Sequence, residues 1–130
     1  MKTIEELKQM FEQDRFVKLS GIEIENVSEK GAVCSVEICD EHLNALDTPQ
    51  GGLIYTLADF TFAVAANAQK APTVTLSGNM NYLNASHGKK LIATAEVKNP
   101  GKHICVYETT VVDDTGKKIA VATFTGYIKN

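Results

Sequence analysis

The alternation of apolar and polar residues predicts a helix and then a pair of strands in the first part of the chain. Apolar residues at helical spacing, after a possible capping residue at Thr3, predict a helix over residues 3–14: Ile4, Leu7, Met10 and Phe11. Residues 23–27 and 31–39 alternate with a period of two, as strands do, and the sequence SEKG supplies the turn between them. Residues 40–50 show neither period and predict a loop.

A long apolar segment, residues 51–69, predicts a central helix. Asp59 and Asn67 interrupt it and argue against a membrane-spanning helix, so a helix buried in the protein core fits better. Because this helix is apolar nearly all round, a sheet must surround it rather than pack on one side of it. Small side chains allow the sheet to approach closely: Ala58, Ala63, Ala65, Ala66 and Ala68.

The period of two returns after residue 73. One parity carries mainly apolar side chains: Val74, Leu76, Met80 and Tyr82. The other carries polar ones: Thr75, Ser77, Asn79 and Asn81. Further strands are predicted over residues 89–99, 103–113 and 117–129, and the tight turns NPGK and DDTGK make them antiparallel. The prediction is one α+β domain over residues 1–130, with a long central helix wrapped by a curved antiparallel sheet and an extra N-terminal helix.

Charge and cysteine content narrow the class of protein. The net charge is −3 and the lysines are scattered, so neither a nucleic-acid partner nor a membrane partner is expected. The N-terminus is charged throughout and lacks the apolar core of a signal peptide. The three cysteines fit no metal-ligand or redox spacing and are interpreted as reduced, buried side chains: Cys34, Cys39 and Cys105. We therefore predict a cytoplasmic protein, and the dispersed histidines (His42, His87 and His103) predict no metal site.

Two glycines, Gly51 and Gly52, open the central helix. The first N–H groups of a helix have no partner within the helix and lie at the positive end of its dipole. A glycine there lets a ligand oxygen approach the backbone, and a developing oxyanion is a suitable ligand. The alternative is that Pro49 and the glycines only shape the turn into the helix.

Asp59 lies in the middle of the same helix among apolar neighbours, where an unpaired charge is costly. It either hydrogen-bonds a sheet residue such as Ser77 or Asn79, or borders a cleft as a nucleophile or general base. Gly51 and Asp59 are separated by about 12 Å along the helix axis and by about 80° around it. Both groups would have to lie within about 3–3.5 Å of one reacting centre. Two copies of the chain related by symmetry can achieve this, whereas one copy hardly can.

The stretch HLNALDTPQGGLIYTLAD, residues 42–59, resembles the signature of hotdog-fold acyl-CoA thioesterases of the phenylacetate-degradation type. That signature is an Asn, then His-Gly-Gly, then Leu-Ala-Asp on the central helix. The resemblance continues through NMNYLNAS and the strands that follow, and covers nearly the whole chain past the first helix. Asn44, Gly51 and Asp59 stand at matching positions, as does Ser77, where the family carries a Ser or Thr near the catalytic carboxylate.

The resemblance implies a hydrolase that cleaves an acyl- or aryl-CoA to the free acid and CoA, with no cofactor beyond the coenzyme A of the substrate. It implies a homodimer, often paired into a tetramer, with active sites at the subunit interface. The N–H of Gly51 would polarise the thioester carbonyl, and Asp59 of the neighbouring subunit would attack it or activate water. Asn44 and Gln50 would orient the thioester and the loop, and Ser77 would position Asp59 or water.

Two positions depart from the family pattern. Gln50 stands where the family has His; its amide can donate to an oxygen but cannot gain charge. Asp47 stands where the family has Gly, and adds a negative charge near the mouth of the site. These departures motivate an alternative, a non-catalytic dimer that binds an acyl ligand. A hotdog-fold hydratase or dehydratase pairing His42 with Asp59 is a further alternative, but the usual pattern of a His with a helix Glu is absent.

Substrate binding is assigned to residues near the helix start, on the strand after the helix and at strand ends: Gly52, Asn79, Lys89, Lys90, Lys102 and His103. The lysines, together with Lys117, are interpreted mainly as solvated strand ends, of which one or two would contact the phosphates of coenzyme A.

Overall fold

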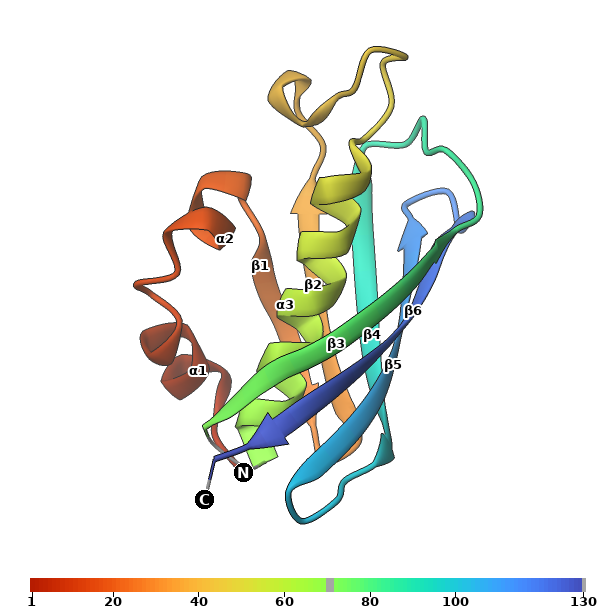
Figure 1. Ribbon diagram of the computed structural model, residues 1–130. Helices are drawn as coiled ribbons and strands as arrows, with labels where there is room; N and C mark the ends of the chain where they lie inside the picture. The colour runs from red at the N-terminus through yellow and green to blue at the C-terminus, as the bar shows by residue number, and fades with distance from the viewer. Residues whose placement is uncertain (70–71, 130) are drawn as a thin grey trace.

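The computed structural model describes residues 1–69 and 72–129. Its helices are α1 (Ile4–Met10), α2 (Arg15–Ser20), the short 3-10 helix η1 (Asp40–His42) and α3 (Gly51–Gln69). Its strands are β1 (Glu23–Ser28), β2 (Gly31–Glu37), β3 (Thr73–Tyr82), β4 (Lys90–Asn99), β5 (Ile104–Asp113) and β6 (Lys118–Ile128). They form one sheet in the order β1-β2-β4-β5-β6-β3, and each neighbouring pair is antiparallel (Figure 1).

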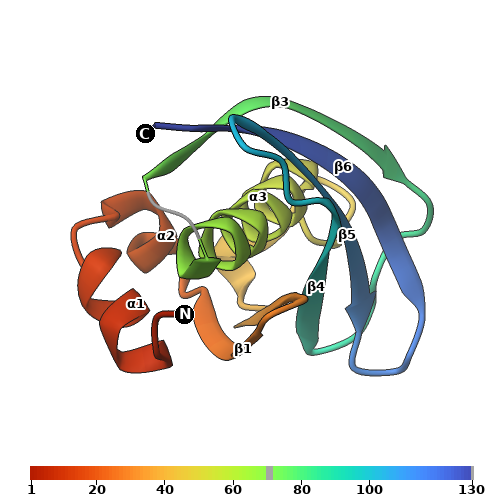
Figure 2. The ribbon, with the colours of Figure 1, turned by 90° about the horizontal axis from the view of Figure 1, so that it is seen from below.

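The sheet curves around α3, and α1 and α2 lie on the side that the sheet leaves open (Figure 2). Most of α3 is buried, as its apolar composition predicts. Phe62 shows how helix and sheet interlock: its ring stacks on Phe124 of β6 at 5.5 Å and meets Tyr107 of β5 edge-on at 5.4 Å. Burial of such large side chains on both layers holds α3 inside the sheet. The predicted α+β architecture with a wrapped central helix is confirmed.

The N-terminal helix differs from its prediction because it is split in two. Thr3 caps α1 together with Glu6, as expected, but α1 ends at Met10. Asp14 then starts α2, because its side chain accepts a hydrogen bond from the N–H of Val17. The predicted apolar stripe is therefore interrupted, and Met10 is 42% exposed.

Strand β3 contains a β-bulge between Thr75 and Ser77, which changes the faces predicted from residue parity. Thr75 faces α3, where its hydroxyl contacts Asp59. One extra residue later, Gly78 faces α3, since a Cβ there would overlap the Tyr55 hydroxyl and the Phe124 ring. Ser77 consequently points to the outer face of the sheet. The prediction that Thr75 and Ser77 share a face is wrong, because the inserted residue reverses the alternation.

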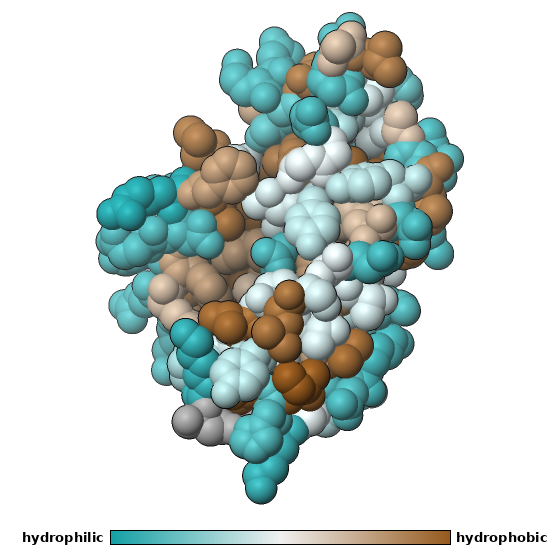
Figure 3. All heavy atoms as spheres, in the orientation of Figure 1, coloured by the Kyte–Doolittle hydropathy of each residue, from teal (hydrophilic) through white to brown (hydrophobic). Residues whose placement is uncertain are grey.

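The outer edge of β3 is exposed. Within residues 1–69 and 72–129, β3 pairs with β6 alone and ends the sheet order. Its apolar side chains Val74 and Leu76 are 41% and 57% exposed, and Figure 3 shows apolar side chains gathered over this strand. A long edge strand with exposed apolar side chains is a template for pairing with another chain.

The three cysteines are free, and their burial differs from one to another. Cys34 and Cys105 are buried as predicted, and burial raises the pKa of the Cys34 thiol to about 12. Cys39 is exposed, so the prediction of burial is wrong there: it immediately precedes η1, outside the sheet. The described residues contain no helix of the length and apolar character needed to cross a membrane. They also contain no group of three or more His, Cys, Asp or Glu side chains arranged to hold a metal ion.

Candidate active site

The N-terminus of α3 presents a free backbone donor. Gln50 caps the helix: its backbone carbonyl accepts from Leu53 N–H at 3.0 Å, and its side-chain Oε1 accepts from Gly52 N–H at 3.0 Å. The N–H of Gly51 makes no hydrogen bond within the part of the chain described here. It therefore lies at the positive end of a 19-residue helix, available to an oxygen that carries negative charge.

The loop before α3 is held by Asn44. Its Oδ1 accepts hydrogen bonds from Leu46 N–H at 2.9 Å, from Thr48 N–H at 3.2 Å and from the Thr48 hydroxyl at 3.3 Å. These bonds fix the direction in which the chain enters the helix. Asp47 in this loop has φ of 60°, in the left-handed region where glycine is favoured and aspartate is tolerated. A glycine at this position would adopt that conformation without strain.

A groove of about 320 Å³ runs beside Gly51 and is walled partly by Asn44, Tyr82 and Asn84. The Tyr82 hydroxyl donates to the Gly51 carbonyl at 3.2 Å, so the end of β3 is fastened to the start of α3. A Cβ at position 51 would lie 3.4 Å from the Tyr82 ring, an ordinary packing distance. Tyr82 was not predicted as a site residue, because only the fold brings the end of β3 to the helix N-terminus.

Asp59 is half-buried and held by a residue that was not predicted. The Thr75 hydroxyl donates to Asp59 Oδ1 at 2.8 Å. Burial raises the pKa of Asp59, the Thr75 hydrogen bond opposes that rise, and the negative charge of Asp14 adds to it. A carboxylate of raised pKa is a stronger proton acceptor. Thr75, and not Ser77, is the hydroxyl that positions Asp59, since the bulge turns Ser77 to the outer face. Leu76 is the extra residue of the bulge, and the alternation of residues in the sequence alone could not reveal that bulge.

The two candidate groups lie in separate hollows of one chain. Asp59 lines a hollow of about 230 Å³ with Phe16, Val17 and Phe60 among its other walls. Within residues 1–69 and 72–129, this hollow and the groove beside Gly51 have no lining residue in common. One chain therefore holds the Gly51 N–H and the Asp59 carboxylate in two separate spaces on the same helix, in agreement with the separation expected from helical geometry.

The remaining predicted residues are spread over the molecule. Gly52 is exposed and its N–H is bound by Gln50. Asn79 lies on the outer face of the sheet, opposite Thr123 of β6. Lys89 and Lys90 lie at the start of β4, where Lys90 forms an ion pair with Glu25 at 3.6 Å.

Lys102 and His103 lie in the turn between β4 and β5, at the end of the sheet opposite to the start of α3 (Figure 1). Within one chain the structure therefore does not bring them together with Gly51.

His42 does not face a carboxylate. Its Nδ1 accepts from Cys39 N–H at 3.1 Å, and its Nε2 is 2.8 Å from the Ser20 carbonyl, to which it donates. Both ring nitrogens are thus used to tie η1 to its surroundings and to the end of α2. The structure provides no His42–Asp59 pair for a hydratase within one chain, and His42 is the last residue of the short helix η1 rather than part of an irregular loop.

Known proteins share this sequence pattern and fold. Residues 50–120 match the Thioesterase superfamily. The acyl-coenzyme A thioesterase PaaI of Escherichia coli is 33% identical over 113 residues, covering 86% of this chain and 81% of the relative. The human acyl-coenzyme A thioesterase 13 is 30% identical over 131 residues, covering 97% and 94% respectively.

The solved structure of the E. coli PaaI protein superposes with a TM-score of 0.91 at 28% identity, covering 97% of this chain and 92% of that one. The matched family region contains both the opening of α3 and Asp59, and the structural match extends to nearly the whole chain. The chain therefore belongs to the thioesterase superfamily, as a PaaI-like hydrolase with the hotdog fold.

Proposed function

We propose that the protein hydrolyses acyl-CoA thioesters in a site shared by two subunits, with Gly51 from one and Asp59 from the other. One observation carries this proposal: a free N–H donor and a carboxylate of raised pKa lie on one helix in two hollows that do not meet. The relatives named acyl-coenzyme A thioesterases support the substrate class.

Pairing of two subunits through the exposed edge of β3 would give such a dimer. Thr75 near one end of β3 holds Asp59, and Tyr82 at the other end contacts Gly51. If two copies of β3 pair antiparallel about a twofold axis near Gly78, the Tyr82 end of one strand lies beside the Thr75 end of its partner. The helix start of one subunit then lies beside the Asp59 region of the other. The exposed apolar side chains of β3 support its role as the interface.

The proposed chemistry needs only groups of this chain, water and the thioester. The N–H of Gly51 donates to the carbonyl oxygen and stabilises the negative charge that forms on it. In the general-base route, Asp59 takes a proton from water as the water oxygen bonds to the carbonyl carbon. The C–S bond then breaks, the thiolate of coenzyme A leaves, and Asp59 returns the proton to it. In the nucleophilic route, an Asp59 oxygen attacks first, the thiolate leaves, and water cleaves the resulting anhydride.

Binding of coenzyme A is assigned to basic residues near the interface. In the antiparallel dimer, Lys89 and Lys90 of the subunit that provides Gly51 would lie at the same end as Lys102 and His103 of the subunit that provides Asp59. The phosphates would then lie near basic side chains from two chains, and Lys90 would exchange its ion pair with Glu25 for them. Asn44 is assigned to the loop that presents the thioester to Gly51, in keeping with its three hydrogen bonds to that loop.

A thiol-release assay on short, medium and aromatic acyl-CoAs tests the activity. We expect release of free coenzyme A, and loss of about 10²-fold or more in turnover for Asp59→Asn with the fold retained. Tight binding without thiol release would contradict the enzyme and favour a binding protein. Full activity of Asp59→Asn would show that Asp59 is structural.

Mixed dimers test the shared site. One chain carries Asp59→Asn and the other Gly51→Pro, which deletes the N–H donor where proline is tolerated at a helix start. Each homodimer should be nearly inactive. Refolding an equal mixture should recover about a quarter of wild-type activity, because half of the dimers are mixed and each contains one intact site of two.

The control is that Gly51→Pro alone folds and forms the same oligomer as wild type. With that control passed, absence of recovery would refute a site built from two chains, since a site within one chain would always keep one defect.

A further inference from the structure

The hollow that contains Asp59 adjoins a second, larger one. The second hollow has a volume of about 430 Å³ and lies between α1, α2, β1 and α3. Asp14, Val17 and Phe60 line both hollows. These three residues therefore form the partition between the two spaces.

Charge decides which part of a thioester can enter the Asp59 hollow. Asp59 and Asp14 are its ionisable carboxylates, and among the residues that the structure describes no Lys, Arg or His lines it. Two carboxylates repel the phosphates of coenzyme A. The other walls include the apolar side chains of Phe16, Val17 and Phe60, which suit a hydrocarbon group. The acyl group therefore enters this hollow, and coenzyme A extends from the other side of the thioester bond.

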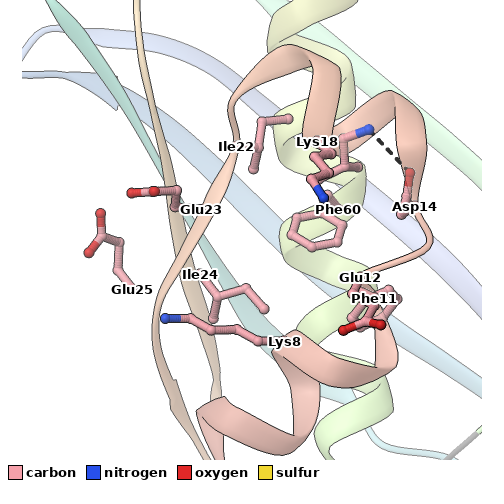
Figure 4. A pocket seen from close by; sticks show the side chains of 11 residues that line it. Lys8, Phe11, Glu12, Asp14, Lys18, Ile22, Glu23, Ile24, Glu25 and Phe60 are labelled. Carbon is pink, nitrogen blue, oxygen red and sulfur yellow. Dashed lines mark hydrogen bonds between the residues drawn. The ribbon is translucent and has the colours of Figure 1, made fainter.

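Phe60 is the residue of α3 that takes part in this partition, and its side chain is apolar. It follows Asp59 directly in the sequence, is only 6% exposed, and packs edge-on against Phe11 with ring centroids 5.2 Å apart. Figure 4 shows Phe60 projecting from α3 toward the N-terminal helices, with Ile24 of β1, and Ile22 just before that strand, on the far side of the hollow. The base of the second hollow is apolar, and its rim carries charged side chains of both signs: Lys8, Glu12, Lys18, Glu23 and Glu25.

Resting on the function proposed above, we propose that Phe60 sets the limit on acyl chain length by closing the Asp59 hollow off from the second one. A hollow of 230 Å³ is smaller than the roughly 300–1,000 Å³ of pockets that enclose drug-sized ligands. We accordingly expect the wild-type protein to prefer shorter acyl-CoAs than variants with a smaller residue at position 60. A smaller side chain at position 60 joins the two spaces, and the apolar base of the second hollow then receives a longer chain.

Part of the wall around Phe60 comes from the N-terminal part of this chain. Phe11 and Val17 lie in residues 1–49, outside the region that matches the thioesterase superfamily. The catalytic groups thus lie in the family region, and part of the acyl-binding wall comes from the two N-terminal helices. This division allows the acyl specificity to change without altering Gly51 or Asp59.

The test measures hydrolysis of saturated acyl-CoAs of about two to fourteen carbons by wild type, Phe60→Leu and Phe60→Ala. We expect the longest efficiently hydrolysed chain to increase in both variants. Each additional buried methylene should raise kcat/KM by about fourfold over wild type on the same substrate. Ala63→Leu, which adds bulk to the Asp59 hollow, should shorten the limit.

Phe62→Leu is the matched control. Phe62 lies on the same helix and is buried, but it packs against Phe124 and Tyr107 and lines neither hollow. It should lower stability without changing the chain-length profile. If Phe60→Ala fails to fold, the test uses the other two variants: Phe60→Leu should lengthen the acyl-chain limit and Ala63→Leu should shorten it.

Binding of the same acyl-CoAs to Asp59→Asn and to Asp59→Asn/Phe60→Leu, measured by calorimetry, separates this inference from the proposed function. Absence of thiol release by wild type would refute the proposed function, and the dependence of the Kd on chain length would still decide the role of Phe60. An unchanged dependence on chain length for the Phe60 variants would overturn the inference. An equal shift for Phe62→Leu would also overturn it, because the effect would then be general loosening of the core.

Discussion

Replacing Thr75 by valine should weaken catalysis by removing one hydrogen bond from Asp59. The Thr75 hydroxyl donates to Asp59 Oδ1 at 2.8 Å, and valine keeps the branched shape of the side chain without the donor. A hydrogen bond to a charged group contributes about 1.5–3 kcal/mol. Because Thr75 is exposed on the edge strand, the lower value of about 1.5 kcal/mol is appropriate. Because the bond holds Asp59 in position toward the thioester, we expect loss of that free energy from the transition state to lower kcat/KM by about tenfold.

The same substitution has a predictable effect on pH dependence. Burial and the charge of Asp14 raise the pKa of Asp59, and the Thr75 hydrogen bond lowers it. Removing the bond therefore raises the pKa of Asp59 further, since the charged form loses its donor. Asp59 must be ionised to act as base or nucleophile. The acid limb of the pH profile of kcat/KM should thus move to higher pH, measured by thiol release over a pH series.

Ser77→Ala is the control for this prediction. Ser77 is two residues further along β3 but points to the outer face, so the variant should match wild type in kcat/KM and in pH profile. Circular dichroism and the oligomeric state of both variants should be unchanged. The reasoning would be refuted by full activity of Thr75→Val with an unmoved acid limb, or by an equal loss in Ser77→Ala.

Substitutions at three further positions test the loop, the cap and a buried carboxylate. Asp47→Val should lower the free energy of unfolding by about 1–2 kcal/mol, because Asp47 has φ of 60°. Asp47→Gly should change the free energy of unfolding by less, and equal Tm values for the two variants would contradict this. Gln50→His should be at least as active as wild type on some acyl-CoA in the thiol-release panel. Uniformly lower activity with unchanged folding would mean that this loop is adapted to Gln50, whose side chain accepts a hydrogen bond from Gly52 N–H. Asp113→Asn should destabilise the fold at neutral pH by about 2 kcal/mol, because Asp113 accepts hydrogen bonds from Ser86 and Thr115. Burial alone would raise the pKa of Asp113, but these hydrogen bonds and the one from the Lys117 N–H lower it below the ordinary value of 3.8. The stabilisation that ionised Asp113 gives the fold is therefore complete above pH 3.8 and is lost as the pH falls below that value. The difference in Tm between wild type and Asp113→Asn should therefore shrink in acid, and a constant difference would contradict the assignment.

The sequence determined the elements of this protein because their signals are local. The apolar helix over residues 51–69 and the strands around it are specified by periodicity and turn residues, and the structure has them close to the predicted bounds. Gly51 and Asp59 were also identifiable from the chain alone, since a glycine pair at a helix start and a carboxylate in an apolar helix are local anomalies. Their separation along the helix follows from helical geometry.

The tertiary structure decided which side chains meet these groups. Thr75 reaches Asp59 only because one extra residue in β3 reverses the alternation of faces, and residue parity cannot show an insertion of that kind. Tyr82 reaches Gly51 because the sheet curls around α3 and brings the end of β3 to the helix start. The second N-terminal helix, begun by the Asp14 cap, places Val17 and Phe16 beside Asp59. Each of these contacts joins residues far apart in the sequence, and so depends on how the layers pack rather than on any local pattern.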